Sequence, residues 1–323
     1  MAAEVSAEWC AASFGLGEPR QALQFMARGQ TNPLGVFRLE TQHGSFAVKI
    51  LGTRPSAGAL LIERAAHAAG VPMAEPLRSI TGEACLRAPD AGRELWIRIY
   101  PWIDGEPGRW GVCAEESSYA VGVLMARVHR LRVPPEALEA VAWEPPGETG
   151  WRELAAAAHA RGLSWGEGLL EKLAVLLSLE NEARAAARHE VTPSQRDYHP
   201  PNIIQRADGE RVLVDWDAAG PCDARREVIL FALRWAGAIG AEPQRELVQA
   251  LVRGYVAGGA AFPTPSLEEV RAALLPNVWW LWFNVQRDVG PAPGADDWLV
   301  PALLSQVGLP DPAFVQRRRA LFP

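Results

Sequence analysis

Three polar side chains of the kind used in catalysis stand within six residues of one another, in the segment PSQRDYHPPNII at positions 193–204. They are Asp197, His199 and Asn202. Zinc would need more nitrogen or sulfur ligands at short spacing, and the neighbouring sequence offers none. The prolines after His199 favour a turn, so the segment taken alone is as consistent with a structural loop as with an active site.

The residues that follow favour a functional site. The segment RVLVDW reads as a buried strand that ends in Asp215, and a buried carboxylate has to be ion-paired, hydrogen-bonded or bound to a metal. With the turn ADGE, the segments NIIQR and RVLVDW predict a hairpin that brings Asn202 and Asp215 close together. Carboxylate and amide oxygens are hard ligands that suit Mg²⁺, which in turn binds phosphate groups. The pattern therefore indicates a magnesium and phosphate site with Asp197 beside it.

The composition excludes several classes of protein. The 323 residues are 49% hydrophobic and 22% charged, which is ordinary for a soluble globular protein. The net charge of −6 argues against a nucleic-acid partner. No run of 18 apolar residues and no signal peptide is recognised, so no membrane partner is expected. The four cysteines are far apart and form no CxxC pair, which indicates reduced thiols in a cytoplasmic protein.

The first hundred residues predict mostly strands, with one helix. Residues 34–51, LGVFRLETQHGSFAVKIL, alternate around the turn QHG and predict an antiparallel hairpin. Residues 59–70, ALLIERAAHAAG, have helical spacing and end in glycine. Residues 82–102 predict two further strands around the turn PDAG.

The rest of the chain predicts helices, with the hairpin at 202–216 as the one clear pair of strands. Helices are expected at 115–131, 168–190, 225–237, 245–258, 266–289 and 298–307, and a surface loop at 143–151. Prolines and glycines at 100–108 mark a boundary. We therefore predict an α+β chain with a small antiparallel β-rich lobe at residues 1–101 and a larger helical lobe at residues 102–323.

The segment QRDYHPPNIIQRADGERVLVDWDAAGPCD resembles a motif of the aminoglycoside phosphotransferase family, which has a protein-kinase-like two-lobe fold. The family pattern is roughly H-[GR]-D-x-H-x-x-N, then a hairpin and a hydrophobic strand that ends in D-W or D-F. The matching residues are Asp197, His199, Asn202, Asp215 and Trp216. This chain departs at Gln195, where the family usually has a histidine that supports the catalytic loop.

The N-terminal half resembles the same family, and the resemblance runs from about residue 20 to residue 290. FAVKIL resembles the strand with the phosphate-binding lysine, here Lys49, and LLIERAA resembles the helix with its partner, here Glu63. RGQTNPLGVFRLE resembles the first hairpin, and YPWIDGE resembles the hinge that meets adenine. The nucleotide-site candidates in these two segments are Gly29, Thr31, Asn32, Tyr100 and Trp102.

The resemblance implies roles for the central residues. Asp197 would accept the proton of the acceptor hydroxyl, and Asn202 and Asp215 would bind Mg²⁺ that bridges the phosphates of ATP or GTP. His199 is expected to pack the loop, and Asp217 is interpreted as a solvated residue. Cys113 and Cys222 carry no predicted role.

The acceptor site is expected among the C-terminal helices, where tryptophans and carboxylates gather. The candidates for contact with the substrate are Asp288, Asp296, Asp297 and Trp282. Such residues suit an aminated sugar or an amino alcohol, although tryptophans at helical spacing are also typical of a core.

These residues predict an ATP-dependent phosphotransferase that acts on a hydroxyl of an aminoglycoside-like or other antibiotic or sugar-containing natural product, as resistance kinases do. The alternatives are a metabolic kinase for choline, homoserine or a thio-sugar, and a nucleotide-binding pseudokinase. The partner would be a small-molecule acceptor, and the chain would be a monomer or a homodimer.

Overall fold

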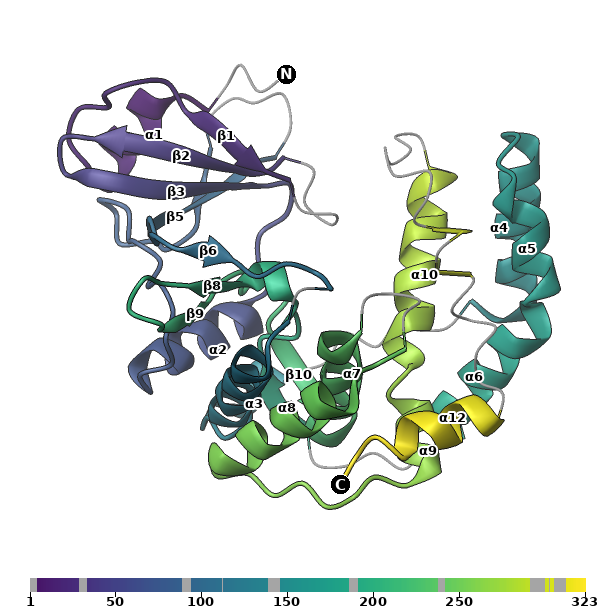
Figure 1. The fold of residues 1–323 in the computed structure, drawn as a ribbon. Helices are drawn as coiled ribbons and strands as arrows, with labels where there is room; N and C mark the ends of the chain where they lie inside the picture. Colours follow the sequence, from purple (N-terminus) through teal and green to yellow (C-terminus); the bar gives the residue numbers. More distant parts are fainter. Residues whose placement is uncertain are drawn as a thin grey trace.

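The computed structural model of the chain describes residues 5–28, 34–88, 94–111, 113–138, 146–185, 191–237, 242–290, 300–301, 303–304 and 312–323. The N-terminal part is dominated by a sheet and the remainder by helices, as Figure 1 shows. None of the helices in these ranges is long and apolar enough to cross a membrane.

The N-terminal sheet has five antiparallel strands in the order β1-β2-β3-β5-β4. They are β1 (Gln24–Ala27), β2 (Val36–Thr41), β3 (Gly44–Leu51), β4 (Leu86–Arg87) and β5 (Trp96–Pro101). The hairpin predicted at 34–51 is confirmed, since β2 pairs with β3 from Val36 opposite Lys49 to Thr41 opposite Gly44. The strands predicted on either side of PDAG are β4 and β5, while the turn itself lies outside the described residues.

The sheet has one apolar and one polar face, because successive side chains of a strand point to opposite sides. Leu39, Val48 and Ile97 are buried in a cluster with helix α1 (Ala7–Phe14). Lys49 and Arg98 are register partners in the alternate positions and therefore share the polar face. This alternation points the lysine away from the apolar cluster.

Helix α1 corrects the prediction of a single helix in the first hundred residues. Ser6 caps its N-terminus by accepting from the backbone N–H of Trp9, and Gly15 ends it in the left-handed conformation, with φ of 65°. The predicted helix at 59–70 is α2 (Ala57–Ala68). Its buried residue Ile62 joins the main core of the helical part.

Two small sheets flank the central loop, residues 195–202. The predicted hairpin is β8 (Ile203–Gln205) and β9 (Arg211–Leu213), and β6 (Glu106–Pro107) pairs with β8 on its other side. A second antiparallel pair was not predicted: β7 (Val191–Ser194) and β10 (Gly220–Asp223). Each strand of this pair contains a proline, Pro193 opposite Pro221, and proline argues against a strand when only the sequence is read.

The helical part follows the predicted pattern in some places and departs from it in others. The predictions at 115–131, 225–237 and 245–258 are confirmed as α3 (Glu115–His129), α7 (Ala224–Ala236) and α8 (Arg245–Ala257). The other helical elements are η1 (Pro135–Leu138), α4 (Gly147–Ala160), α5 (Trp165–Glu171), α6 (Leu173–Ala185), η2 (Pro200–Asn202), α9 (Leu267–Ala272), α10 (Leu275–Asp288) and α12 (Pro312–Arg319).

Three predicted boundaries were wrong. The surface loop expected at 143–151 gives way to α4 from Gly147 on. The long helix expected at 168–190 is two helices, α5 and α6, and the single helix expected at 266–289 is α9 and α10. In the second case Pro276 in the first turn of α10 cannot donate a backbone hydrogen bond, so a new helix begins there. Most of the helix expected at 298–307 lies outside the described residues.

Helices α3 and α8 cross with their backbones in close contact. A Cβ atom on Gly122 of α3 would lie 2.0 Å from the carbonyl oxygen of Leu251, and one on Gly254 of α8 would lie 1.9 Å from that of Tyr119. Only glycine permits this approach. Together with α7, this pair forms the apolar platform on which the central loop lies.

Candidate active site

The central loop connects β7 to β8, and we call residues 195–202 the catalytic loop. It ends in the short helix η2, where the backbone N–H of Asn202 donates to the carbonyl oxygen of His199 at 2.9 Å. Trp235 of α7 donates from its ring nitrogen to the carbonyl oxygen of Tyr198 at 2.6 Å, and Tyr198 is fully buried. The loop is therefore fixed to the platform, while Asp197 keeps 34% of its side chain exposed.

Gln195 joins the catalytic loop to the end of β9. Its side-chain NH₂ donates to the carbonyl oxygens of Val214 at 3.0 Å and Asp215 at 2.5 Å, and its Oε1 accepts the backbone N–H of Asp197 at 2.8 Å. Gln195 is fully buried. A single neutral amide thus links the backbone of Asp197 to that of Asp215.

We expect Gln195→Glu to destabilise the fold by about 2–3 kcal/mol. The carboxylate would direct an oxygen at two carbonyl oxygens in a buried place, which leaves all three without a donor. Urea unfolding of the variant measures the loss. The matched control is Gln205→Glu, because Gln205 is exposed on β8 and should tolerate the change; equal stability of the two variants would contradict the assignment.

The predicted magnesium ligands are neighbours in the structure. The backbone N–H of Val214 donates to the carbonyl oxygen of Asn202 at 3.0 Å, which places Asn202 next to the residue before Asp215. The side-chain amide of Asn202 donates to the carbonyl oxygen of Asp197 at 2.9 Å. Asp215 has φ of 64°, a left-handed conformation that non-glycine residues seldom adopt and that is frequent at functional sites.

Lys49 reaches this site across the chain. Its Nζ lies 2.6 Å from Oδ1 of Asp215 and 2.6 Å from Oδ2 of Asp217. Burial alone would lower the pKa of Lys49, but the two carboxylates outweigh it, and the pKa lies above its ordinary value. The lysine is therefore a fixed positive charge between two acids.

The expected pair between Lys49 and Glu63 is not formed. Glu63, nearly fully buried on α2, pairs instead with the guanidinium of Arg98 and accepts from the hydroxyl of Tyr100 at 3.1 Å. Arg98 also lies 3.1 Å from Oδ1 of Asp217. Arg98 is fully buried, and its charge would be costly without carboxylate partners, whereas Lys49 already has two. Glu63 therefore pairs with Arg98.

Asp217 is likewise not the solvated residue we expected. It bridges Lys49 and Arg98, and 21% of its side chain is exposed. Arg98 lies in the otherwise apolar strand segment WIRIYP, and an arginine there was a signal that the sequence analysis missed. Glu63 is thus connected to the Asp215 segment through Arg98 and Asp217.

The two hinge candidates differ in their surroundings. Tyr100 lies on β5 opposite Ala47, with its hydroxyl donated to Glu63. Trp102 follows β5 and lies under the guanidinium of Arg38, 4.8 Å from its carbon to the ring centroid. The other nucleotide-site candidates, Gly29, Thr31 and Asn32, lie outside the described residues.

The acceptor candidates on α10 are largely enclosed. Asp288 is 7% exposed and lies 3.5 Å from the guanidinium of Arg287, and Trp282 packs against the core cluster that includes α4 to α6. Trp279 and Trp280 of the same helix each stack on Phe283, and of these three side chains Trp279 is the exposed one. Asp296 and Asp297 lie outside the described residues.

His199 lies beside Asp197 in the catalytic loop. Its Nε2 is 3.3 Å from Oδ1 of Asp197, and its ring contacts that of Trp110, with centroids 4.8 Å apart. Burial, and then the charge of Arg234, lower the pKa of His199 well below its ordinary value. The imidazole is therefore neutral at physiological pH, which agrees with a packing role.

A buried hydrogen-bond network lies behind the catalytic loop. His129 Nε2 is 2.7 Å from Oε2 of Glu227, and its Nδ1 is 3.0 Å from the hydroxyl of Tyr255. Ser194 donates to the same Glu227 oxygen at 2.7 Å and accepts the backbone N–H of Arg196 at 2.8 Å. The network thus reaches Arg196, the residue before Asp197, and the sequence analysis had not singled out any of its members for this role.

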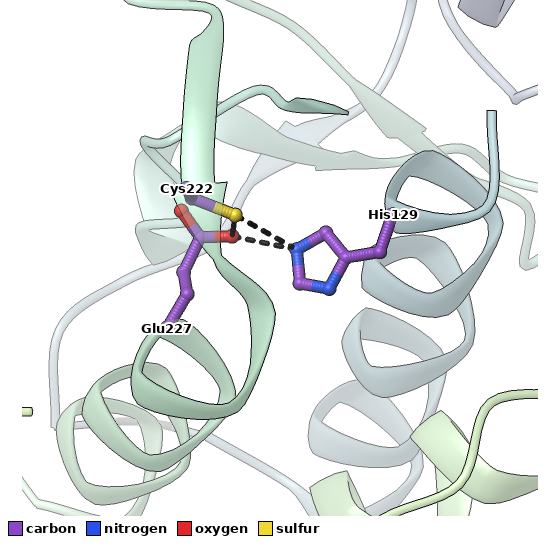
Figure 2. A group of neighbouring side chains, drawn as sticks. All are labelled: His129, Cys222 and Glu227. Atoms are coloured by element: carbon purple, nitrogen blue, oxygen red, sulfur yellow. Dashed lines mark hydrogen bonds and ion pairs between the residues drawn. The ribbon is translucent and has the colours of Figure 1, made fainter. Parts of the chain in front are cut away.

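His129, Cys222 and Glu227 also offer the donor atoms of a zinc site, all within 4.8 Å of one another (Figure 2). The Nε2–Oε2 distance of 2.7 Å is a hydrogen-bond distance, whereas two ligands of one tetrahedral zinc ion stand about 3.3 Å apart. Burial, and then Glu227, raise the pKa of the Cys222 thiol well above its ordinary value, so it is protonated. We therefore interpret the three side chains as a support of the catalytic loop.

The β-rich N-terminal part and the helical remainder, which carries the catalytic loop, define a protein-kinase-like α+β fold with two lobes. Solved structures confirm this fold. A spectinomycin phosphotransferase in complex with ADP and spectinomycin superposes with a TM-score of 0.70 at 14% identity, over 98% of this chain and 97% of that one. An amicoumacin kinase in complex with AMP-PNP and Ca²⁺ gives 0.65 at 18% identity, over 92% and 90%. A choline/ethanolamine kinase family protein from Mesorhizobium loti gives 0.60 at 15%, over 96% and 95%.

The chain belongs to the phosphotransferase enzyme family, whose model matches residues 23–262. The predicted resemblance and the prediction of a phosphotransferase are thereby confirmed. None of the curated proteins compared with the chain matches it.

Proposed function

We propose that the protein transfers the γ-phosphoryl group of ATP to a hydroxyl group of a small molecule. The convergence of Lys49, Asp197 and Asp215 carries this proposal. Lys49 and Asp215 are 166 residues apart in the chain and 2.6 Å apart in space, and Gln195 fixes Asp197 to the same end of β9. Phosphoryl transfer depends mainly on positioning and charge neutralisation. Lys49 would neutralise phosphate charge, and the two aspartates would position the acceptor and a metal ion.

The nucleotide would lie between the polar face of the first sheet and the catalytic loop. Lys49 would bind the phosphates of the nucleotide, and Tyr100 and Trp102 would flank its adenine ring. The spectinomycin and amicoumacin kinases, which have the same fold, are nucleotide complexes, and this supports ATP as the donor. We include the lobes at residues 1–101 and 102–323 in the proposal as the nucleotide-binding part and the part that holds the loop and the acceptor.

Asn202 and Asp215 fit a magnesium ion. Asn202 uses its NH₂ group on the carbonyl oxygen of Asp197, which leaves its amide oxygen as an acceptor. Asp215 is 36% exposed, and its present partner is a lysine that would itself turn to phosphate. When bound, Mg²⁺ would neutralise charge on the phosphate groups.

Asp197 would act as the base. The acceptor oxygen forms a bond to the γ-phosphorus, the bond from that phosphorus to the β–γ bridging oxygen breaks, and ADP leaves with the electron pair. The hydroxyl proton passes to the Asp197 carboxylate late in the transfer. The side chains of Gln195 and Asn202 hydrogen-bond to the backbone of Asp197 and so position this residue for the step.

The acceptor we favour is an antibiotic or another sugar-containing natural product. The neighbours with TM-scores of 0.70 and 0.65 are kinases of spectinomycin and amicoumacin, which supports this class. The alternative is an amino alcohol, because choline and ethanolamine kinases share the fold with TM-scores between 0.55 and 0.62.

The test is transfer from Mg·ATP to a panel of spectinomycin-like, aminoglycoside, nucleoside and peptide antibiotics, with choline, ethanolamine and homoserine as the second group. Product mass reads the outcome. A gain of one phosphate on an antibiotic supports the proposal, and a gain on an amino alcohol alone supports the alternative. ATP binding without transfer to any acceptor would favour a pseudokinase.

We expect the rate to depend on the ionisation of Asp197. Burial, and then the charge of Asp215, raise the pKa of Asp197 to about 6. A base must be ionised, so kcat/KM should fall about tenfold for each pH unit below that pKa and level off above it. A profile from about pH 5 to 8 measures the midpoint, and a flat profile over that range would contradict Asp197 as the base.

A further inference from the structure

Arg234 is a partly buried cation beside the catalytic loop. It lies on α7, and one guanidinium nitrogen is 3.1 Å from Nε2 of His199 while another donates to Oδ1 of Asn277 on α10 at 2.6 Å. That same His199 nitrogen is 3.3 Å from Oδ1 of Asp197. The guanidinium is therefore one side chain away from the proposed base.

Within the described residues, Arg234 forms no ion pair with a carboxylate. Burial lowers the pKa of Arg234 to about 10, so it still carries its charge at neutral pH. Its two side-chain hydrogen-bond partners, His199 and Asn277, are both neutral. The charge of Asp197 raises the pKa of Arg234, but it acts from beyond His199 and not through a direct ion pair. A partly buried charge without a direct counter-ion costs free energy.

Four other arginines with buried or partly buried side chains do have such a partner. The pairs are Arg98 with Glu63 and Asp217, Arg225 with Glu269, Arg226 with Asp223, and Arg318 with Glu242. Arg234 thus differs from them at the one place where an anion of the reactants would arrive. A bound anion would complete the pair that the chain itself leaves open.

We propose that Arg234, oriented by Asn277, receives an anionic oxygen of the bound reactants beside Asp197. Guanidinium groups bind phosphoryl and carboxylate oxygens through paired N–H donors, and near a transferring phosphoryl group they stabilise the charge of the transition state. Two sources share this chemistry: the transferred phosphoryl group, and a carboxylate or phosphate carried by the acceptor. The inference rests on the proposed function, and it refines the acceptor class if the second source holds.

The decisive variant is Asn277→Asp. It places a carboxylate where an amide oxygen now lies 2.6 Å from the guanidinium, so it supplies the missing counter-ion from within the chain. An arginine that only joins α7 to α10 would be held at least as firmly, with an unchanged or higher melting temperature. If Arg234 receives an anion, the new carboxylate would pair with its guanidinium and compete with that anion. Asn277→Ala is the matched control, since it removes the hydrogen bond without adding charge.

Two titrations separate the sources. In the first, calorimetry measures the affinity for Mg·ADP with and without aluminium fluoride, which mimics the transferred phosphoryl group. In the second, the protein is saturated with Mg·AMP-PNP, so that the γ-phosphate position is filled, and inorganic phosphate is titrated in.

We expect Asn277→Asp to lose at least tenfold in one of these titrations, Asn277→Ala to lose much less, and binding of Mg·ADP alone to stay the same. A loss in the first titration assigns the phosphoryl group, and a loss in the second assigns an anionic acceptor. Unchanged affinities in both, or equal losses in the Asp and Ala variants, would overturn the inference. Wild-type protein that binds no Mg·ADP would instead overturn the proposed function, and the inference with it.

Discussion

Replacement of Asp197 by asparagine is expected to lower kcat by at least about a hundredfold and to leave the affinity for Mg·nucleotide nearly unchanged. Asparagine keeps the size and the polar contacts of the side chain but cannot take the proton of the acceptor hydroxyl, and a positioned base contributes about 10²–10⁴ to the rate. Single-turnover transfer to the acceptor that the panel identifies measures the effect. Calorimetry with Mg·ADP supplies the binding arm.

The fold should tolerate this change well. Burial and the neighbouring Asp215 raise the pKa of Asp197, which means that its ionised form is disfavoured in the folded protein. A neutral asparagine relieves that repulsion, so the melting temperature should stay the same or rise. The control is Asp208→Asn in the exposed turn between β8 and β9, which should keep full activity. Wild-type turnover in the Asp197 variant would remove Asp197 from the mechanism.

Replacement of Asp215 by asparagine is expected to weaken binding of the magnesium nucleotide by about a hundredfold, because one of two proposed protein ligands loses its charge. Asparagine is the right substitute here because it tolerates the left-handed φ of 64°, whereas alanine would add backbone strain. Calorimetry with ADP, with and without Mg²⁺, measures the change.

Comparing ADP binding with and without Mg²⁺ distinguishes the loss of a metal ligand from a general loss of nucleotide binding. Without Mg²⁺ the variant should bind ADP at least as well as the wild type, since Lys49 loses one of its two carboxylate partners and turns more readily to phosphate. A variant that gains as much affinity from Mg²⁺ as the wild type would show that Asp215 does not bind the ion. Asp215→Gly keeps the backbone free of strain and is the second variant to compare.

Much of the site could be predicted because its members are close in sequence. Asp197 and Asn202 share one loop, and a short hairpin carries Asp215 back to them, so spacing alone places three oxygen-bearing side chains together. The hairpin around Lys49 followed from its alternation of apolar and polar residues. In each case a local pattern determines the geometry.

The choice of ion-pair partner could not be predicted in this way. Arg98 is 35 residues from Glu63 and 119 from Asp217, and only the tertiary arrangement of α2, β5 and the segment after β9 decides which carboxylates it meets. The sequence offered Lys49 and Glu63 as a pair by analogy, and a second cation on the same face of the sheet changed the pairing. The strands with Pro193 and Pro221 were missed for another reason: tertiary pairing overrode a local signal against strand.

The glycine crossing of α3 and α8 has a consequence for the order in which the molecule loosens. Gly122 and Gly254 allow two backbones to touch, and neither helix can slide on the other without a collision between main-chain atoms. The amide protons that face this seam should therefore exchange with solvent water only through global unfolding. Those of the first sheet, whose ion pairs to α2 and to the segment after β9 are made by side chains, should exchange through smaller openings. The first sheet would then open locally while the crossing of α3 and α8 stays closed.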